Sequence, residues 1–437
     1  MNEAVGEAAT IEAARTDGAT TLYRKVGWRL LPFLLACYVL AYLDRVNVGF
    51  AKLGMQSELG LSDAAYGLGA GIFFIGYVLF EVPSNLLQAR IGARRTIGRI
   101  MLLWGLASMA MMFVQGPWSF YALRFVLGVF EAGFAPGMLF YLTGWYPAER
   151  RGQIMAVVLL AGPVGNILGG PLSGWLISSF HGANGLSGWQ WMFLIEGLPA
   201  VLLGIAAFYY LPDRPAEAGW LTRDEGRRIV AALDAPGNRS EASLAVALRD
   251  PRLYAYGLVY YCLISGLYTV SFWLPTLLRD AGIRDIAAIG WLSVVPYLVA
   301  VGAMLANARS SDRRRERRWH VMLPTCAGAV GLAVAALAGN LPVAFLGIGL
   351  ATVGTYAAYA VFWTVPTASL KGTAAAGGIA LINSIGALGG FVSPAVIGLA
   401  KDLTGSLSAG LLAMAGLLAL GAVACAFALA ERRRAAF

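Results

Sequence analysis

The segment Arg124-Phe-Val-Leu-Gly-Val-Phe-Glu131-Ala-Gly-Phe-Ala-Pro-Gly137 is apolar enough for a membrane interior, yet it carries two opposite charges. On a helix, Arg124 and Glu131 share one face, about 10 Å apart. Each ionisable side chain at membrane depth costs at least about 2.5–3.5 kcal/mol, so both should face protein or water. They form either a buried ion pair that fixes packing or part of a binding or proton-relay helix, and we favour the second. Close approach of a neighbouring helix is expected at Gly128, Gly133 and Gly137.

The composition indicates an integral membrane protein. The chain has 437 residues, of which 58% are hydrophobic and 13% charged, whereas soluble domains average about 25% charged residues. The net charge of +9 comes from arginines in short loops, which sets topology and argues against nucleic-acid binding. Four isolated cysteines and two histidines predict neither a metal site nor a catalytic centre.

Apolar runs of about 20 residues predict twelve membrane-spanning helices. We place them at about 27–48, 64–86, 96–114, 118–141, 153–179, 190–211, 253–278, 286–308, 319–339, 341–366, 374–399 and 406–430. Residues 1–20 are small, polar and acidic, which predicts a disordered tail. The predicted parts are a cytoplasmic tail at 1–26, six-helix bundles at 27–211 and 252–430, a cytoplasmic central loop at 212–251 and a cytoplasmic tail at 431–437. Residues 221–233 could form a short amphipathic surface helix or a flexible tether.

Arginine bias predicts the orientation. The loops after the second, fourth, sixth, eighth and twelfth spans are rich in arginine, and those on the other side contain few basic residues. Basic loops stay on the cytoplasmic side, so both termini and the central loop should be cytoplasmic. We expect a multi-pass protein of a bacterial inner membrane.

The two halves carry related loops. Asn85-Leu-Leu-Gln-Ala-Arg90-Ile-Gly92-Ala-Arg94-Arg95 follows the second span, and Ser311-Asp312-Arg313-Arg-Arg-Glu-Arg-Arg318 follows the eighth. Two six-span halves imply parallel repeats with a substrate path between them. The chain resembles the major facilitator superfamily, whose motif G-x-x-x-D-R-x-G-R-R is matched at Arg90, Gly92 and Arg94. Asn85 and Ala89 replace its usual glycine and aspartate. The second copy keeps Asp312 and Arg313.

Shorter motifs narrow the resemblance to the anion:cation symporter family, whose members include permeases for hexonates, glucarate, tartrate, phthalate and 4-hydroxyphenylacetate. The matching segments are Tyr42-Leu-Asp-Arg-Val-Asn47, Phe80-Glu-Val-Pro-Ser-Asn85, Arg124 with Glu131-Ala-Gly-Phe, Trp145-Tyr-Pro, Trp191-Met-Phe-Leu-Ile-Glu-Gly-Leu-Pro and Ala380-Leu-Ile-Asn-Ser. The resemblance implies a monomer in the lipid bilayer, which needs no cofactor and uses the proton as coupling ion.

The first half contains the candidate coupling groups. A proton-coupled anion carrier needs a carboxyl that exchanges a proton and a cation that holds the substrate's carboxylate. Asp44 and Glu131 are the carboxyl candidates, and Arg45 and Arg124 the cations. Asp44 and Arg45 could instead be an interfacial charge pair. The resemblance implies that Asp44 and Glu131 bind protons, that Arg45 faces the substrate and that Arg124 pairs with a carboxylate.

The second half has no comparable charge within its spans, so we expect it to recognise substrate through hydroxyls and rings. The candidate substrate-binding residues are Arg45, Tyr42, Asn47, Tyr77, Tyr268, Trp363 and Asn383. The candidate gating residues are Glu81, Arg90, Gly92, Arg94, Asp312 and Arg313. Glu81 should act as a gate or pair with the Arg90 loop, and no role is predicted for Glu196.

These patterns predict a secondary transporter that imports an organic anion with protons by alternating access. Moving each charge against 100 mV costs about 2.3 kcal/mol, which a co-transported proton offsets. No nucleotide-binding motif or catalytic constellation is present in the sequence, which argues against an enzyme. The segments around Trp363 and Asn383 resemble tartrate permeases and favour a hydroxy-dicarboxylate or sugar acid. An aromatic carboxylate such as phthalate or 4-hydroxyphenylacetate, or uncoupled diffusion, remains the alternative.

Overall fold

A computed structural model describes residues 2–233, 249–369 and 373–428. Within these ranges the regular elements are helices, and twelve segments are long and apolar enough to cross a membrane, as predicted. The first half contains α1 (Asn2–Glu58), α2 (Asp63–Ile91), α3 (Ala93–Ala110), α4 (Pro117–Glu131), α5 (Phe134–Thr143), α6 (Ala148–Leu159), α7 (Ala161–Ser179) and α8 (Gly188–Tyr210). The second contains α11 (Pro251–Asp280), α12 (Ile286–Arg314), α13 (Arg318–Leu337), α14 (Leu341–Phe362), α15 (Thr364–Ser369), α16 (Thr373–Thr404) and α17 (Ser408–Ala428).

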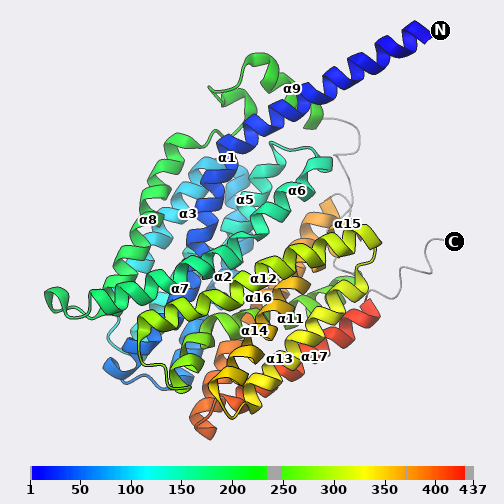
Figure 1. The fold of residues 1–437 in the computed structure, drawn as a ribbon. Coiled ribbons are helices and arrows are strands. Elements are labelled where there is room, and N and C mark those ends of the chain that lie inside the picture. The colour runs from blue at the N-terminus through cyan, green and yellow to red at the C-terminus, as the bar shows by residue number, and fades with distance from the viewer. Residues whose placement is uncertain (1, 234–248, 370–372, 429–437) are drawn as a thin grey trace.

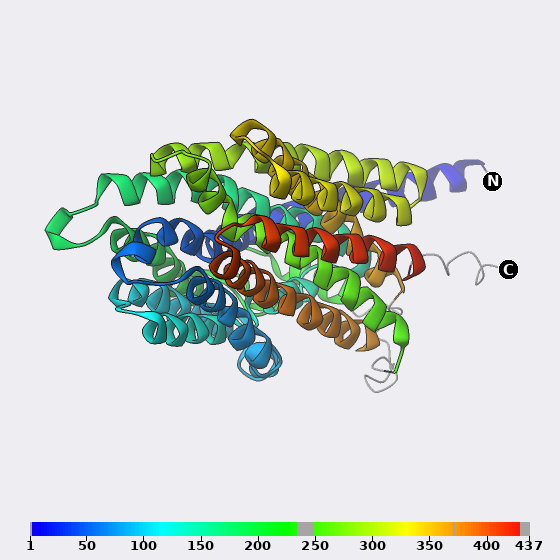
Figure 2. The same cartoon turned by 90° about the horizontal axis from the view of Figure 1, so that it is seen from below.

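The helices form two groups side by side, α1–α8 and α11–α17 (Figures 1 and 2). The groups meet mainly where α2 packs on α16 and α7 on α12, with α1 against α11 between them. One crossing brings backbone against backbone: a Cβ added at Gly290 would lie 2.4 Å from the carbonyl oxygen of Gly170. A side chain at either position would force α7 and α12 apart. The two glycines therefore allow the halves to pack closely at this crossing.

Three of the predicted continuous spans are pairs of shorter helices: α4 with α5, α6 with α7 and α14 with α15. The break between α4 and α5 falls at Gly133, whose φ of 85° is accessible to glycine at no steric cost. Glu131 therefore ends α4 and does not lie in the middle of a straight helix. The expected close approach does occur, since a Cβ at Gly128 would lie 2.0 Å from the carbonyl oxygen of Phe73 on α2.

The N-terminal segment also differs from expectation. We expected residues 1–20 to be disordered, but α1 begins at Asn2 and runs without interruption into the first span. The segment is rich in alanine and glutamate, which have high intrinsic helix propensity.

The central loop contains α9 (Arg223–Leu233), so of the two alternatives this segment forms the short helix. An ion pair of 2.7 Å between Lys25 and Glu225 joins α9 to α1. The rest of that loop at 234–248 and the predicted tail at 431–437 lie outside the described residues.

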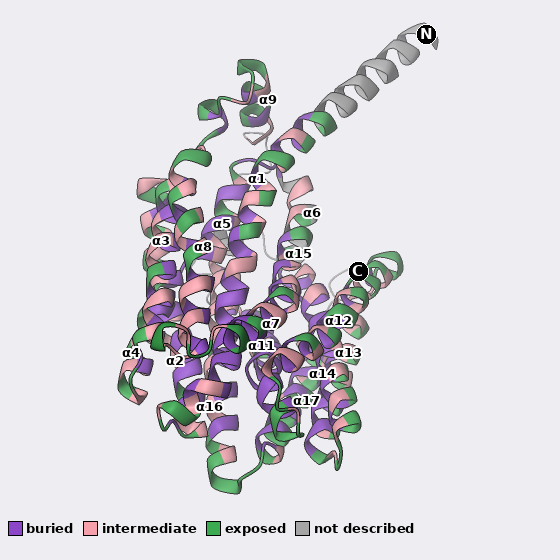
Figure 3. Ribbon diagram, turned by 60° about the vertical axis from the view of Figure 1, so that its left-hand side comes forward, coloured by how far each residue is buried: buried purple, intermediate pink, exposed green. Residues whose placement is uncertain are grey.

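Burial divides most of the described helices into two faces, whereas α11 is buried on nearly every side. Buried residues lie mainly where helices meet, and exposed ones along the outside (Figure 3). The outer face includes large apolar side chains such as Phe140, Trp175 and Leu346. A bilayer would cover such a surface, and Trp118 and Tyr209, which are more than 80% exposed near helix ends, have the character of interfacial aromatic residues.

Candidate functional site

Arg45 on α1 lies where the two halves meet. Its Nε donates to Oε1 of Glu131 at 2.7 Å, and its Nη2 forms an ion pair with the same oxygen. Its Nη1 donates to the hydroxyl of Tyr268 on α11 at 3.1 Å. One guanidinium therefore links a carboxylate of the first half to a hydroxyl of the second. The structure thus brings together three residues that the sequence pointed to separately.

Aromatic rings surround this guanidinium. The Arg45 Cζ lies 5.4 Å from the ring centroid of Tyr42, 5.3 Å from that of Tyr77 and 5.6 Å from that of Phe73. All four side chains are buried. A desolvated cation on a ring face gains about 2 kcal/mol, so the rings help to hold an arginine at membrane depth. The N–H groups at the edge of the guanidinium are used instead for the contacts with the Glu131 carboxylate and the Tyr268 hydroxyl.

Asp44, beside Arg45, has a different environment. It accepts hydrogen bonds from Trp104 Nε1 at 2.5 Å, Asn47 Nδ2 at 3.2 Å and the hydroxyl of Ser108. All three donors are neutral, and no cation among the described residues lies within ion-pair distance of this buried carboxyl. Glu131 has a guanidinium partner and Asp44 has none, so the two predicted proton sites are electrostatically distinct.

A third carboxyl adjoins Asp44. Glu196 on α8 is buried and accepts from Asn47 Nδ2 at 3.0 Å and from the Ser173 hydroxyl at 2.7 Å. The Asn47 amide therefore donates to both Asp44 and Glu196. Sequence reasoning gave Glu196 no role and missed Ser173, Trp104 and Ser108. One signal was present: Trp104 and Ser108 are four residues apart, so they share a helix face.

Arg124 does not form the expected ion pair with a carboxylate. Its Nε and Nη2 donate to the carbonyl oxygens of Gly69 and Ala70 at 3.3 and 3.1 Å, and its Cζ lies 5.0 Å from the Phe73 ring. Its Nη1 has no hydrogen-bond partner. The close packing of α4 on α2 at Gly128 places this guanidinium against the α2 backbone.

Glu81 contacts the second half and not the Arg90 loop. Its Oε1 accepts from Asn383 Nδ2 on α16 at 2.8 Å, a second polar contact between the halves, while Arg90 is exposed and does not pair with it. Trp363 is half-buried and packs edge-to-face on Tyr260, with ring centroids 4.8 Å apart, and it is not among the rings that surround Arg45.

The two motif loops are held by local contacts. The Arg94 N–H donates to Asp213 Oδ1 at 2.8 Å, and Gly92 adopts a φ of 88° against the same carboxylate. In the second copy Asp312 pairs with Arg317 at 2.6 Å, and Arg313 is exposed.

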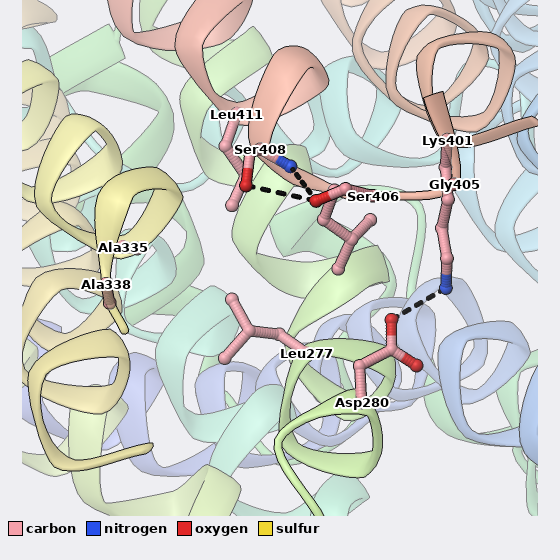
Figure 4. Close-up of a pocket in the computed structure, with 10 residues that line it drawn as sticks. Leu277, Asp280, Ala335, Ala338, Lys401, Gly405, Ser406, Ser408 and Leu411 are labelled. Atoms are coloured by element: carbon pink, nitrogen blue, oxygen red, sulfur yellow. Dashed lines mark hydrogen bonds and ion pairs between the residues drawn. The ribbon is translucent and has the colours of Figure 1, made fainter. Parts of the chain in front are cut away.

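A charge cluster joins the halves where α2 begins and α16 ends. Asp63 lies 2.5 Å from Lys52 Nζ and 3.7 Å from Lys401 Nζ, and Lys401 pairs with Asp280 at 2.7 Å. The Asp402 carboxylate accepts the backbone N–H of Asp63 at 2.9 Å. Figure 4 shows the Lys401–Asp280 pair beside a pocket of about 450 Å³, which none of the predicted site residues line. The sequence analysis predicted none of the residues of this charge cluster as site residues.

Comparison with known proteins agrees with this architecture. The family description Major Facilitator Superfamily matches residues 34–394. The chain belongs to the major facilitator superfamily. It is a transport protein and not an enzyme.

Two bacterial proteins of this superfamily match the chain over nearly its whole length. The putative metabolite transport protein NicT of Pseudomonas putida is 45% identical over 95% of this chain and 96% of its own. A putative tartrate transporter of Agrobacterium vitis is 47% identical over 94% of this chain and 93% of its own. Among solved structures, an inward-facing, unoccupied bacterial homologue of the human lysosomal transporter Spinster superposes with a TM-score of 0.72. It covers 91% of this chain and 96% of its own at 18% identity, which establishes the shared fold.

Proposed function

We propose that this protein is an organic-anion:proton symporter of the anion:cation symporter family, in a bacterial inner membrane with both termini cytoplasmic. The favoured substrate is a hydroxy-dicarboxylate or sugar acid such as tartrate, glucarate or a hexonate. The position of Arg45 between Glu131 and Tyr268 carries this proposal. The relative named as a tartrate transporter supports this substrate class.

The mechanism follows from charge balance around Arg45. A substrate carboxylate can bind a guanidinium through two parallel hydrogen bonds, but Glu131 already occupies Arg45. Adding a second anion to this buried pair would leave an uncompensated charge, which is costly in a water-poor interior. A proton on Glu131 neutralises that carboxylate and frees Arg45 for the substrate. Proton and anion are therefore bound together.

The contacts between the halves supply the alternation. Arg45–Tyr268 and Glu81–Asn383 cross the interface beside the site. The Lys52–Asp63–Lys401–Asp280 cluster, which we call the clamp, and the Gly170–Gly290 crossing close the interface where α2 begins. Opening that end requires breaking the clamp and separating α7 from α12. Substrate that binds Arg45 and Tyr268 together would then favour the state in which both halves contact it.

The aromatic rings favour a second substrate class. Tyr42, Tyr77 and Phe73 surround Arg45, and Tyr260 and Trp363 form a further ring pair nearby in the second half. Such surfaces would stack an aromatic acid such as phthalate or 4-hydroxyphenylacetate.

The experiment is uptake of labelled tartrate into proteoliposomes, with and without an inward proton gradient, for wild type and Asp44→Asn. Hexonates and aromatic acids serve as competitors. We expect accumulation driven by the gradient, lost in Asp44→Asn, with exchange retained. Equal, non-accumulating uptake by both proteins would refute coupling and leave an uncoupled facilitator. Transport of a competitor but not of tartrate would replace the substrate and keep the mechanism.

A further inference from the structure

Carboxyls outnumber cations in the buried interior. Among the described residues, the buried charged side chains of the first half, apart from the clamp residue Lys52, are two guanidiniums and four carboxyls: Arg45, Arg124, Asp44, Glu81, Glu131 and Glu196. Arg45 is paired with Glu131, and Arg124 is bound to backbone carbonyls. Even if Arg124 offsets one more carboxylate, two carboxyls lack a counter-charge. Unpaired charges are costly at this depth, so these carboxyls are suited to carry protons.

Glu196 is one of these carboxyls, and its partners are all neutral. It lies eight residues into α8, about 12 Å along the helix axis from Gly188. Asp44 on α1 is the titratable group that faces it. Helix α7 contributes the Ser173 hydroxyl, and α3 contributes the Ser108 hydroxyl, which donates to Asp44.

Asn47 joins Glu196 to Asp44 in a way that suits proton exchange. Its Nδ2 donates to both carboxyls, while its Oδ1 is buried without a hydrogen-bond partner. A protonated carboxyl is itself a donor and would need an acceptor. Rotation of the amide would present Oδ1 to a protonated carboxyl and leave N–H for the ionised one. The bridge therefore accommodates a proton at either carboxyl.

We propose that Glu196 is a second site for a transported proton, linked to Asp44 by the Asn47 amide. Each cycle then carries a proton on Glu196 in addition to the one that neutralises Glu131 beside Arg45. The O–H bond formed at Glu196 on loading is broken on release, when Ser173 and Asn47 stabilise the resulting carboxylate. This inference rests on the proposed symport function.

The test is the number of protons carried per substrate. The labelled acid that wild type transports is added outside proteoliposomes across which a pH gradient is imposed. The ratio of internal to external acid at equilibrium is measured for several sizes of the gradient. Each coupled proton contributes about tenfold accumulation per pH unit. In Glu196→Gln we expect this slope to fall by one proton, about tenfold per pH unit. A wild-type slope in Glu196→Gln would overturn the inference and restrict Glu196 to a structural role.

Two further variants control the test. Glu58→Gln removes a more exposed carboxyl that also contacts α8, through Trp189 Nε1 at 2.8 Å, and should keep the wild-type slope. If Glu196→Gln does not reconstitute, Glu196→Asp retains a carboxyl at an altered distance from Ser173. It should keep the slope but shift the pH at which transport is half-maximal, and an unshifted midpoint would overturn the inference. Failure of wild type to accumulate any tested acid would instead refute the proposed symport.

Discussion

Replacing Glu131 by glutamine separates substrate binding from proton binding. In the structure Glu131 Oε1 accepts from Nε of Arg45 and forms an ion pair with its Nη2, while Oε2 has no hydrogen-bond partner among the described residues. Glutamine keeps the shape and one acceptor but removes the charge. A hydrogen bond to a charged group contributes about 1.5–3 kcal/mol and a neutral one about 1 kcal/mol. The interaction that holds Arg45 should therefore weaken by about 0.5–2 kcal/mol, a factor of about 2–30 in equilibrium.

We expect this difference to appear as tighter substrate binding. At pH 8, where wild type must take up a proton to release Arg45, Glu131→Gln should bind the transported acid about 2–30-fold more tightly. At pH 6 the two proteins should be closer, so the variant's affinity should depend less on pH. Binding is measured by titration calorimetry on purified protein, and transport by proteoliposome accumulation and exchange. The variant should exchange substrate but accumulate less of it.

Tyr268→Phe is the matched control, because it removes the other polar contact of Arg45 without changing any charge. It should weaken binding yet keep the pH dependence of wild type. Competition between substrate and Glu131 would be refuted if Glu131→Gln bound no more tightly than wild type at pH 8, or if its affinity kept the full pH dependence.

Two further predictions concern the interface between the halves. Gly290→Val places side-chain atoms against the Gly170 carbonyl and, at about 1–3 kcal/mol for overpacking, should favour separation of α7 and α12. A cysteine at the buried Ser293 should then react faster with a thiol reagent than in the parent, and unchanged labelling would contradict the idea. Asn383→Ala removes the 2.8 Å hydrogen bond from Asn383 to Glu81 Oε1 and leaves Ser384 as a donor from α16, so the contact between the halves should weaken by about 1 kcal/mol. Exchange rates measure this effect, and wild-type exchange would remove Glu81–Asn383 from the gating contacts.

The fold could be predicted in outline because hydropathy and arginine bias are properties of consecutive residues and can be evaluated without knowing the tertiary contacts. It could not reveal the break at Gly133, because a packing glycine and a glycine with positive φ look alike in an apolar run. Around Arg45, the sequence predicted Tyr42, Tyr77, Glu131 and Tyr268, because each is a polar group in an apolar span. It did not single out Phe73, which is one of many phenylalanines in these spans. The contacts among the residues around Arg45 depend on how α1, α4 and α11 pack, which spacing alone does not define.

Glu196 is a clearer example of a site residue whose role could not be predicted from sequence. Its environment is built from Asn47 on α1 and Ser173 on α7, which are far from it in sequence. The expected pairing of Arg124 failed for a similar reason. A guanidinium can be satisfied by backbone carbonyls, and those of Gly69 and Ala70 are exposed to it only because α4 packs so closely on α2.

All buried charged side chains among the described residues lie in the first half, and the second half meets them with hydroxyls, amides and rings. This asymmetry has an evolutionary consequence. Substitutions on α11, α14 or α16 can reshape the space beside Arg45 while leaving the ionisable network intact. A lineage could therefore acquire a new substrate through changes in one half without losing its energy source, whereas most substitutions within the network would abolish accumulation of every substrate at once.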